Sequence, residues 1–192
     1  MNRFFLLLIG IVCGIPYVHS QNVALKSNLL YDATSTINLG VEIGLTPRIS
    51  IDLSGSLNPW ILDKRTNSKI QHILVQPELR YWLCERFKGH FFGAHLHWSN
   101  YNVGAVNLPF GLTEDTWAKY RYRGNLYGGG VGYGYQWVFR RRWAVEGEIG
   151  VGYAFMKYNK YGCKRCGEYL GTQKHHYVGL TKAAVSLIYF IK

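Results

Sequence analysis

Beyond its first twenty residues, this chain of 192 residues has no long apolar run. The apolar segment from Phe4 to Ile15 follows a basic start and precedes the small-residue cleavage site Val18-His19-Ser20, as in a removable export signal. We therefore expect residues 1–20 to be a signal peptide and residues 21–192 to form one mature domain. No later run approaches the ~18 apolar residues that a membrane-spanning helix needs. A mature chain placed in a membrane would have to cross it with strands.

Acidic residues are also scarce. The chain has 11 Asp and Glu against 22 Lys and Arg, a formal net charge of +11. Such a balance suits nucleic acid, anionic lipid or polyanionic sugar as a partner. The export signal excludes nucleic acid from that set. Glycine and tyrosine are abundant, at 22 and 15 residues, which is typical of β-structure with aromatic borders rather than of a helical domain.

Strict apolar/polar alternation marks two neighbouring segments, Ile37 to Leu45 and Ile49 to Leu57, joined by Thr46-Pro47-Arg48. Period-two alternation with a short connection predicts a β-hairpin. The polar positions hold Gly, Ser and Asn with isolated acids, whereas the outer face of a soluble sandwich would be rich in Lys, Glu and Thr. Small polar residues suit the crowded interior of a narrow barrel whose aliphatic face meets lipid.

The same alternation predicts six further strands. They run approximately over Leu25 to Tyr31, His72 to Leu83, Gly89 to Trp98, Tyr127 to Phe139, Trp143 to Phe155, and Lys182 to Lys192. In the Tyr127 to Phe139 segment one face is a row of glycines, which would leave room for bulky or charged neighbours inside a closed barrel.

The connections between these strands alternate in length. Short ones lie at Thr46 to Arg48, Cys84 to Lys88 and Arg140 to Arg142, and long ones at Asn58 to Gln71, Ser99 to Leu126 and Lys157 to His176. Together with the even strand number, this asymmetry is typical of outer-membrane barrels. We therefore expect an all-β fold: an eight-stranded antiparallel up-and-down transmembrane β-barrel with short periplasmic turns and long extracellular loops.

Several sequence blocks carry a family resemblance, above all Pro77-Glu78-Leu79-Arg80-Tyr81-Trp82, with Leu25 to Asp32 and Gly89 to His95. In these blocks the chain resembles a Bacteroidota family of exported proteins catalogued as domain of unknown function 3575. The resemblance implies an outer-membrane β-barrel, in some cases encoded near fimbrial components. It implies no activity and supplies no catalytic residues.

Charged side chains on the inward faces are the first candidates for chemistry. This lumen set comprises Lys26, Glu42, Asp52, Glu78, Arg80, His95, His97, Glu146, Glu148 and Lys182. An eight-stranded lumen is too narrow for a wide channel, so we expect the charges to pair with one another. There are three alternatives. The charges could form a proton path, two carboxylates could perform acid/base catalysis, or the two histidines could hold a metal with Glu78 or Glu42. We expect neither catalysis nor a metal.

Cys163 and Cys166 form a Cys-Lys-Arg-Cys motif in the last long connection. In an exported chain the expected outcome is a short disulfide. A zinc site with His175 and His176 is the alternative, although the spacing is unlike that of known zinc motifs. We expect no cofactor.

The long connections carry basic residues interleaved with tyrosines: Lys119, Arg121, Arg123, Lys157, Lys160, Lys164, Arg165 and Lys174. On a cell surface they would meet phosphorylated lipopolysaccharide or surface glycans. We expect a non-enzymatic outer-membrane protein whose loops bind or shield such a partner, or a fimbrial component. A lipid A modifying enzyme and a narrow pore are the alternatives.

Overall fold

The computed structural model describes residues 23–63, 68–104, 120–162 and 168–191, so the expected signal peptide lies outside the described residues. In chain order the elements are β1 (Val23–Asn28), α2 (Leu29–Ala33), β2 (Ile37–Gly44), β3 (Ile49–Asn58), β4 (Ile61–Asp63), β5 (Ser68–Trp82), β6 (Gly89–Gly104), β7 (Arg121–Arg140), β8 (Trp143–Tyr161) and β9 (Tyr169–Ile191). No helix in these ranges is long and apolar enough to cross a membrane.

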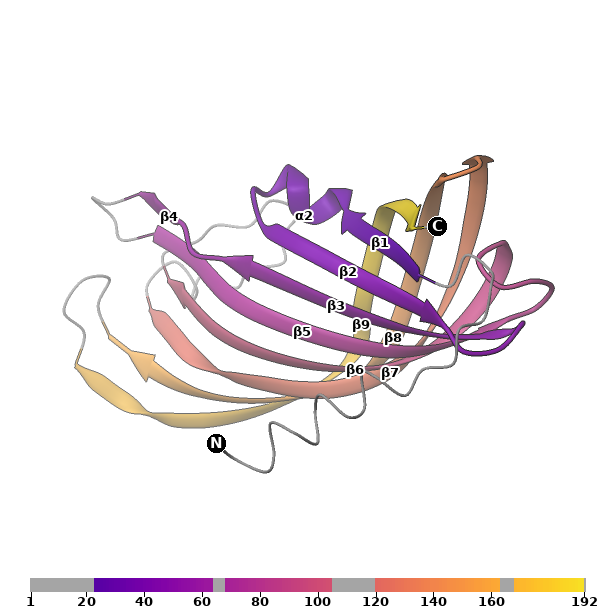
Figure 1. Ribbon diagram of the computed structural model, residues 1–192. Coiled ribbons are helices and arrows are strands. Elements are labelled where there is room, and N and C mark those ends of the chain that lie inside the picture. The colour runs from indigo at the N-terminus through magenta and orange to yellow at the C-terminus, as the bar shows by residue number, and fades with distance from the viewer. Residues whose placement is uncertain (1–22, 64–67, 105–119, 163–167, 192) are drawn as a thin grey trace, which may run out of the picture.

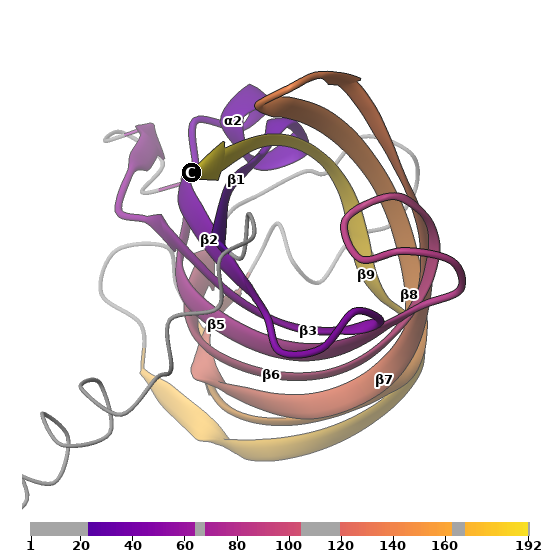
Figure 2. The same ribbon diagram turned by 45° about the vertical axis from the view of Figure 1, so that its right-hand side comes forward.

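Eight antiparallel strands close into a ring, as Figure 2 shows in a view along its axis. Consecutive strands pair, β3 pairs with β5, and β1 pairs with β9 to complete the circle, while the short β4 is added to β5. The predicted hairpin is present, with Ile37 opposite Leu57 and Gly44 opposite Ser50. The predicted eight-stranded up-and-down barrel is therefore confirmed.

The barrel is closed over only part of its length, at the short-turn end. β1 pairs with β9 only between Val23–Asn28 and Ser186–Ile191. Over its remaining length β9 pairs with β8 alone among the described strands. In Figure 1 the far halves of β5 to β9 accordingly form a curved trough on the side of the longer connections, while the short turns gather at the closed end.

The first strand is shorter than the sequence predicted. Leu29 and Tyr31 fall within the predicted strand but belong instead to the helical turn α2. Asn28 causes the change, because its side-chain oxygen accepts a hydrogen bond from the Leu30 N–H at 3.1 Å and so caps the turn. Its own N–H donates to Asn38 Oδ1 at 2.6 Å.

The strands beside the long connections extend further than predicted. β9 begins at Tyr169 rather than near Lys182, and β7 begins at Arg121 rather than Tyr127. Alternation of apolar residues missed these extensions because polar residues occupy outward positions there, namely Asn125, Arg123 and Arg121 on β7 and Lys174 and Thr172 on β9. The prediction that all of Ser99 to Leu126 and Lys157 to His176 is loop was therefore wrong.

The outer wall carries a band of exposed aliphatic side chains. Leu96, Val131 and Val178 are 66%, 63% and 80% exposed. Aromatic residues border the band near the short turns, where Tyr81, Trp137, Phe139 and Trp143 are exposed. At its other border Trp98, Tyr127 and Phe155 lie side by side on β6, β7 and β8, next to His176 of β9.

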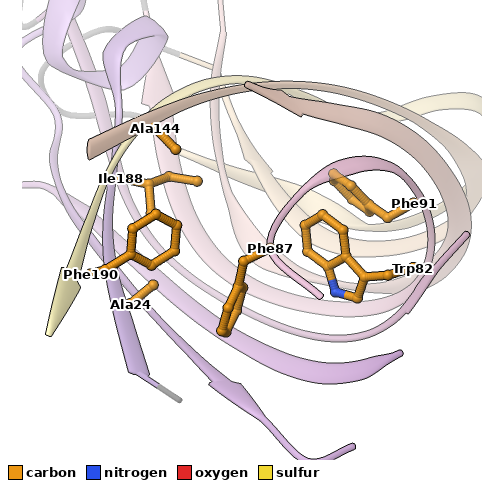
Figure 3. Close-up of a cluster of buried hydrophobic side chains, with 7 residues drawn as sticks. All are labelled: Ala24, Trp82, Phe87, Phe91, Ala144, Ile188 and Phe190. Carbon is orange, nitrogen blue, oxygen red and sulfur yellow. The ribbon is translucent and has the colours of Figure 1, made fainter. Parts of the chain in front are cut away.

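The hydrophobic core fills the lumen at the short-turn end (Figure 3). Trp82 packs on Phe91 with ring centroids 4.7 Å apart, and Phe87 packs on Phe190 at 5.5 Å. Phe87 enters the lumen from the turn between β5 and β6, where its backbone has a φ of 64°. A positive φ is uncommon for a bulky residue, and here the packing of the ring holds it.

Candidate functional site

Arg80 lies at the centre of a buried cluster of charges in the middle of the lumen. Its Nε is 2.6 Å from Glu78, one terminal nitrogen is 3.1 Å from Glu42 and 2.7 Å from Glu146, and the other is 3.1 Å from Asp52 and 2.8 Å from Glu148. These six side chains come from β2, β3, β5 and β8. The planar guanidinium suits this role because its five N–H donors spread in fixed directions.

Two lysines complete what we call the lumen cluster. Lys26 of β1 forms ion pairs with Glu42, with Glu146 at 3.0 Å and with Asp52 at 3.8 Å. Lys182 of β9 forms ion pairs with Glu78 and with Glu148 at 2.9 Å. Eight of the ten predicted lumen residues are thus brought together by ion pairs.

The cluster holds five carboxylates against three cations, a formal charge of −2. Asp52 Oδ1 and Glu148 Oε1 are buried without a hydrogen-bond partner in the described part of the chain. Both residues border an interior cavity of about 50 Å³. That volume is large enough to hold water, the usual partner of such buried oxygens.

Glycines on the inward faces make room for the cluster, as the glycine row predicted. A Cβ at Gly132 would lie 2.9 Å from Glu148 Oε1, and one at Gly93 would overlap the Glu78 carboxylate. Gly134 leaves the space that the Phe91 ring occupies in the hydrophobic core.

The two remaining lumen residues, His95 and His97, lie above the cluster and face inward. His95 Nε2 is 2.9 Å from Thr181 Oγ1, and the two imidazole rings are 5.8 Å apart. Nδ1 of each ring is buried without a hydrogen-bond partner among the described residues. No group of three or more His, Cys, Asp or Glu side chains within the described ranges is placed to hold a metal ion.

The predicted basic loop residues lie largely on strands, which corrects their expected setting. Arg121 and Arg123 belong to β7, Lys157 and Lys160 to β8, and Lys174 to β9. Lys119, Lys164 and Arg165 lie outside the described residues, as do both members of the predicted disulfide, Cys163 and Cys166. Cys84, in the turn after β5, is exposed and free.

Strand register gathers four of these basic residues on the outer wall, together with one that the sequence did not single out. They continue the outward rows of β5, β7, β8 and β9 beyond the aromatic border. We call this set the basic belt: Lys69, Arg121, Arg123, Lys157 and Lys174.

Rows of the belt follow one another in register. Asn100, Asn125, Lys157 and Lys174 are adjacent across four strands, directly beyond Trp98, Tyr127, Phe155 and His176. The next row holds Asn102, Arg123, Asn159 and Thr172. Arg121 and Lys69 follow on either side of Gly104, and the Arg121 guanidinium lies 5.0 Å from the Tyr161 ring centroid.

The belt is a concentration of positive charge without internal compensation. No ion pair joins any of its members to a carboxylate of the described residues. Lys69 lies beyond the apolar band, near the start of β5. Partial burial and the neighbouring charges of Arg121 and Arg123 lower the pKa of Lys69. Arg123, Lys157 and Lys174 are exposed to solvent.

Lys160 lies on the opposite face of β8 from Lys157. Its ammonium is 3.9 Å from the Tyr120 ring centroid, and its side chain lines an interior cavity of about 800 Å³. This cavity occupies the trough, and its lining residues come from α2 and from β5 to β9.

Sequence reasoning missed several residues that hold the lumen together. Trp82 Nε1 donates to Ser50 Oγ at 2.8 Å, and Ser50 donates to Glu42. Gln136 Nε2 donates to the Phe87 carbonyl at 2.8 Å and so fixes the turn that carries Phe87. Alternation marked these positions of Ser50, Trp82 and Gln136 as inward, but nothing in the pattern distinguished them from ordinary lumen residues.

Together the fold and the lumen define a small antiparallel β-barrel that is filled at one end, charged in the middle and open at the other end. The family model for the protein of unknown function DUF3575 matches residues 4–191, so the chain belongs to that family. No curated protein and no solved structure matches the chain.

Proposed function

We propose that this protein is a non-enzymatic outer-membrane β-barrel whose basic belt binds phosphate groups of lipopolysaccharide. The observation that carries the proposal is the position of the belt, directly beyond the aromatic border of an exposed apolar band. Cations at that level of an outer-membrane barrel would face the phosphorylated head groups of neighbouring lipids.

The apolar band has the height that a membrane requires. From Trp143 to Phe155 the β8 strand advances 12 residues, about 40 Å at roughly 3.3 Å per residue. A typical tilt of ~45° reduces this to about 28 Å, close to the ~25 Å apolar band of outer-membrane barrels. In water, by contrast, an exposed apolar surface that encircles the molecule would cause aggregation.

The orientation follows from the connections. Outer-membrane barrels keep their short turns in the periplasm and their longer connections outside. The belt then lies at the outer surface, where lipopolysaccharide supplies phosphates, and Arg and Lys form their strongest hydrogen bonds with such anions. The amide side chains of Asn100, Asn102 and Asn159 lie in the same rows and add neutral donors for sugar or phosphate oxygens.

The filled lumen argues against a pore. Trp82, Phe91 and Ile188 are completely buried at the short-turn end, and the lumen cluster lies above them. An ion crossing the barrel would need to displace both the hydrophobic core and the lumen cluster. For a lipid A modifying enzyme, a histidine on the outer wall should meet a serine or a carboxylate. His176 does face outward, but its Nδ1 is 2.5 Å from the Tyr153 hydroxyl, and no serine or acid of the described residues hydrogen-bonds to it.

Reversing the belt charges tests the proposal. The variant R123E/K157E/K174E should lose most binding of purified lipopolysaccharide, measured with the barrel captured on a biosensor surface. The wild type should bind dephosphorylated lipopolysaccharide as weakly as the variant binds the intact form, and its affinity should fall steeply with salt.

The matched control is R140E/R141E/R142E, which makes the same charge change at the short-turn end. Binding by this control should equal that of the wild type. Equal loss in both variants would mean that only net charge matters, and undiminished binding by the belt variant would exclude the belt as the site.

A further inference from the structure

The interior cavity of the trough is separate from the basic belt, because no belt residue lines it and most of its lining residues lie on inward strand faces. We call it the inner trough. Its volume of about 800 Å³ lies within the range of roughly 300–1,000 Å³ that small-molecule sites occupy. At its inner end the lining includes His97, whose ring lies 5.8 Å from that of His95.

The lining of the inner trough is mostly apolar or aromatic. Five of its 19 lining residues are tyrosines, and six are aliphatic: Leu74, Val103, Leu126, Ala154, Met156 and Leu180. Side chains of this kind gain free energy when an aliphatic chain displaces water from them.

The charge of the lining is as informative as its apolarity. Among the described residues, Lys160 is the only Lys, Arg, Asp or Glu in the lining, so no described carboxylate borders the cavity. The Lys160 ammonium contacts the Tyr120 ring and forms no ion pair with a described residue. An anionic group beside the ammonium would form a charge-assisted hydrogen bond without displacing a carboxylate of the described residues.

The cation and the deepest aliphatic residues lie at opposite ends of the inner trough. Ala154 and Lys160 face inward on β8, six residues apart, which corresponds to about 20 Å at roughly 3.3 Å per residue. One leaflet of a bilayer core is about 15 Å thick, so a lipid-length chain fits between them. The β9 edge from Tyr169 to Val185 has no partner strand on the α2 side among the described residues, so the trough is open along its length.

From these observations we propose that the inner trough binds a long-chain carboxylic acid. The aliphatic chain lies against Leu126, Ala154 and Met156, and the carboxylate pairs with the Lys160 ammonium at the outer end. This site does not depend on the belt, so either proposal can fail without the other.

Native mass spectrometry of the folded barrel with added palmitate tests the site, because it counts ligands on each chain. We expect one palmitate per chain. A154W fills the trough and should weaken binding at least tenfold, while V131W adds the same ring to the outer wall and should bind as the wild type does. L126W is a second filling variant in case A154W does not fold, and heat-modifiable migration identifies the folded samples.

The head-group contact has its own pair of variants. K160E should weaken palmitate binding at least tenfold and leave binding of the uncharged hexadecanol unchanged, whereas K157E, on the other face of β8, should alter neither. Three outcomes would overturn the proposal. They are the absence of a saturable 1:1 adduct, equal palmitate binding by both filling variants and the wild type, and equal effects of V131W and A154W. An unchanged palmitate affinity in K160E would overturn the assignment of the carboxylate.

Discussion

Arg80 is the residue on which the lumen depends most. Its guanidinium lies within 3.1 Å of carboxylate oxygens from five different residues, and it also covers the Phe91 ring at 4.4 Å from the centroid. Without it, two lysines would face five buried carboxylates. Removing one partner from a buried ion pair strongly destabilises the folded state, because the remaining charge stays buried without a partner.

We therefore expect Arg80→Met to lower the free energy of unfolding by about 3–5 kcal/mol. Urea titration in detergent micelles, followed by heat-modifiable migration on a gel, measures this loss. Arg140→Met, at the exposed end of β7, should change stability by no more than ~0.5 kcal/mol. A loss below ~1 kcal/mol in Arg80→Met would show that the cluster is not buried as described.

The sequence predicted which charged residues face inward but not which partners they choose. Alternation alone placed Lys26, Glu42 and Arg80 on lumen faces. Their partners depend on how eight strands are staggered around the ring, and no local pattern encodes that stagger. Phe87 could not be predicted at all, because its entry into the lumen requires a positive φ in a turn of ordinary composition.

At the scale of elements, β9 shows where prediction from alternation ends. Its second half was predicted because Val185, Leu187 and Tyr189 form one outward apolar row, with Ala184 and Ser186 between them on the inward face. Its first half was missed for two reasons. The outward positions turn polar at Lys174 and Thr172, and a register shift between Gly150 and Val151 of β8 leaves Thr181 as an extra residue, which interrupts the period of two.

The one-sided pairing of β9 should be visible in hydrogen exchange. Between Thr172 and Ala184 we expect fast and slow amides to alternate, since every second N–H points away from β8. Amides from Ser186 to Ile191 should all be slow, because both neighbours pair there. Residue-resolved amide hydrogen exchange, measured by NMR in detergent micelles, tests this pattern. Uniform protection from Thr172 to Ile191 would mean that another strand covers the edge.

At the scale of the whole molecule, three layers follow one another along the barrel axis. Aromatic and aliphatic side chains fill the short-turn end, ion pairs cross the middle, and the inner trough opens at the end of the longer connections. On the outside, the apolar band passes through an aromatic border into the basic belt. The order of layers inside and outside agrees with the proposed outer-membrane barrel, in which the short-turn end is filled and the other end is open.

Labelling of single cysteines in intact cells tests this placement most directly. Cys163 and Cys166 are replaced by serine in two variants: the first keeps Cys84 at the short-turn end, and the second carries Cys84→Ser together with Lys174→Cys in the belt. A membrane-impermeant maleimide should modify the belt cysteine in intact cells and reach Cys84 only after lysis. Labelling of Cys84 in intact cells, or protection of the belt cysteine until lysis, would contradict an outer-membrane barrel with its basic belt at the cell surface.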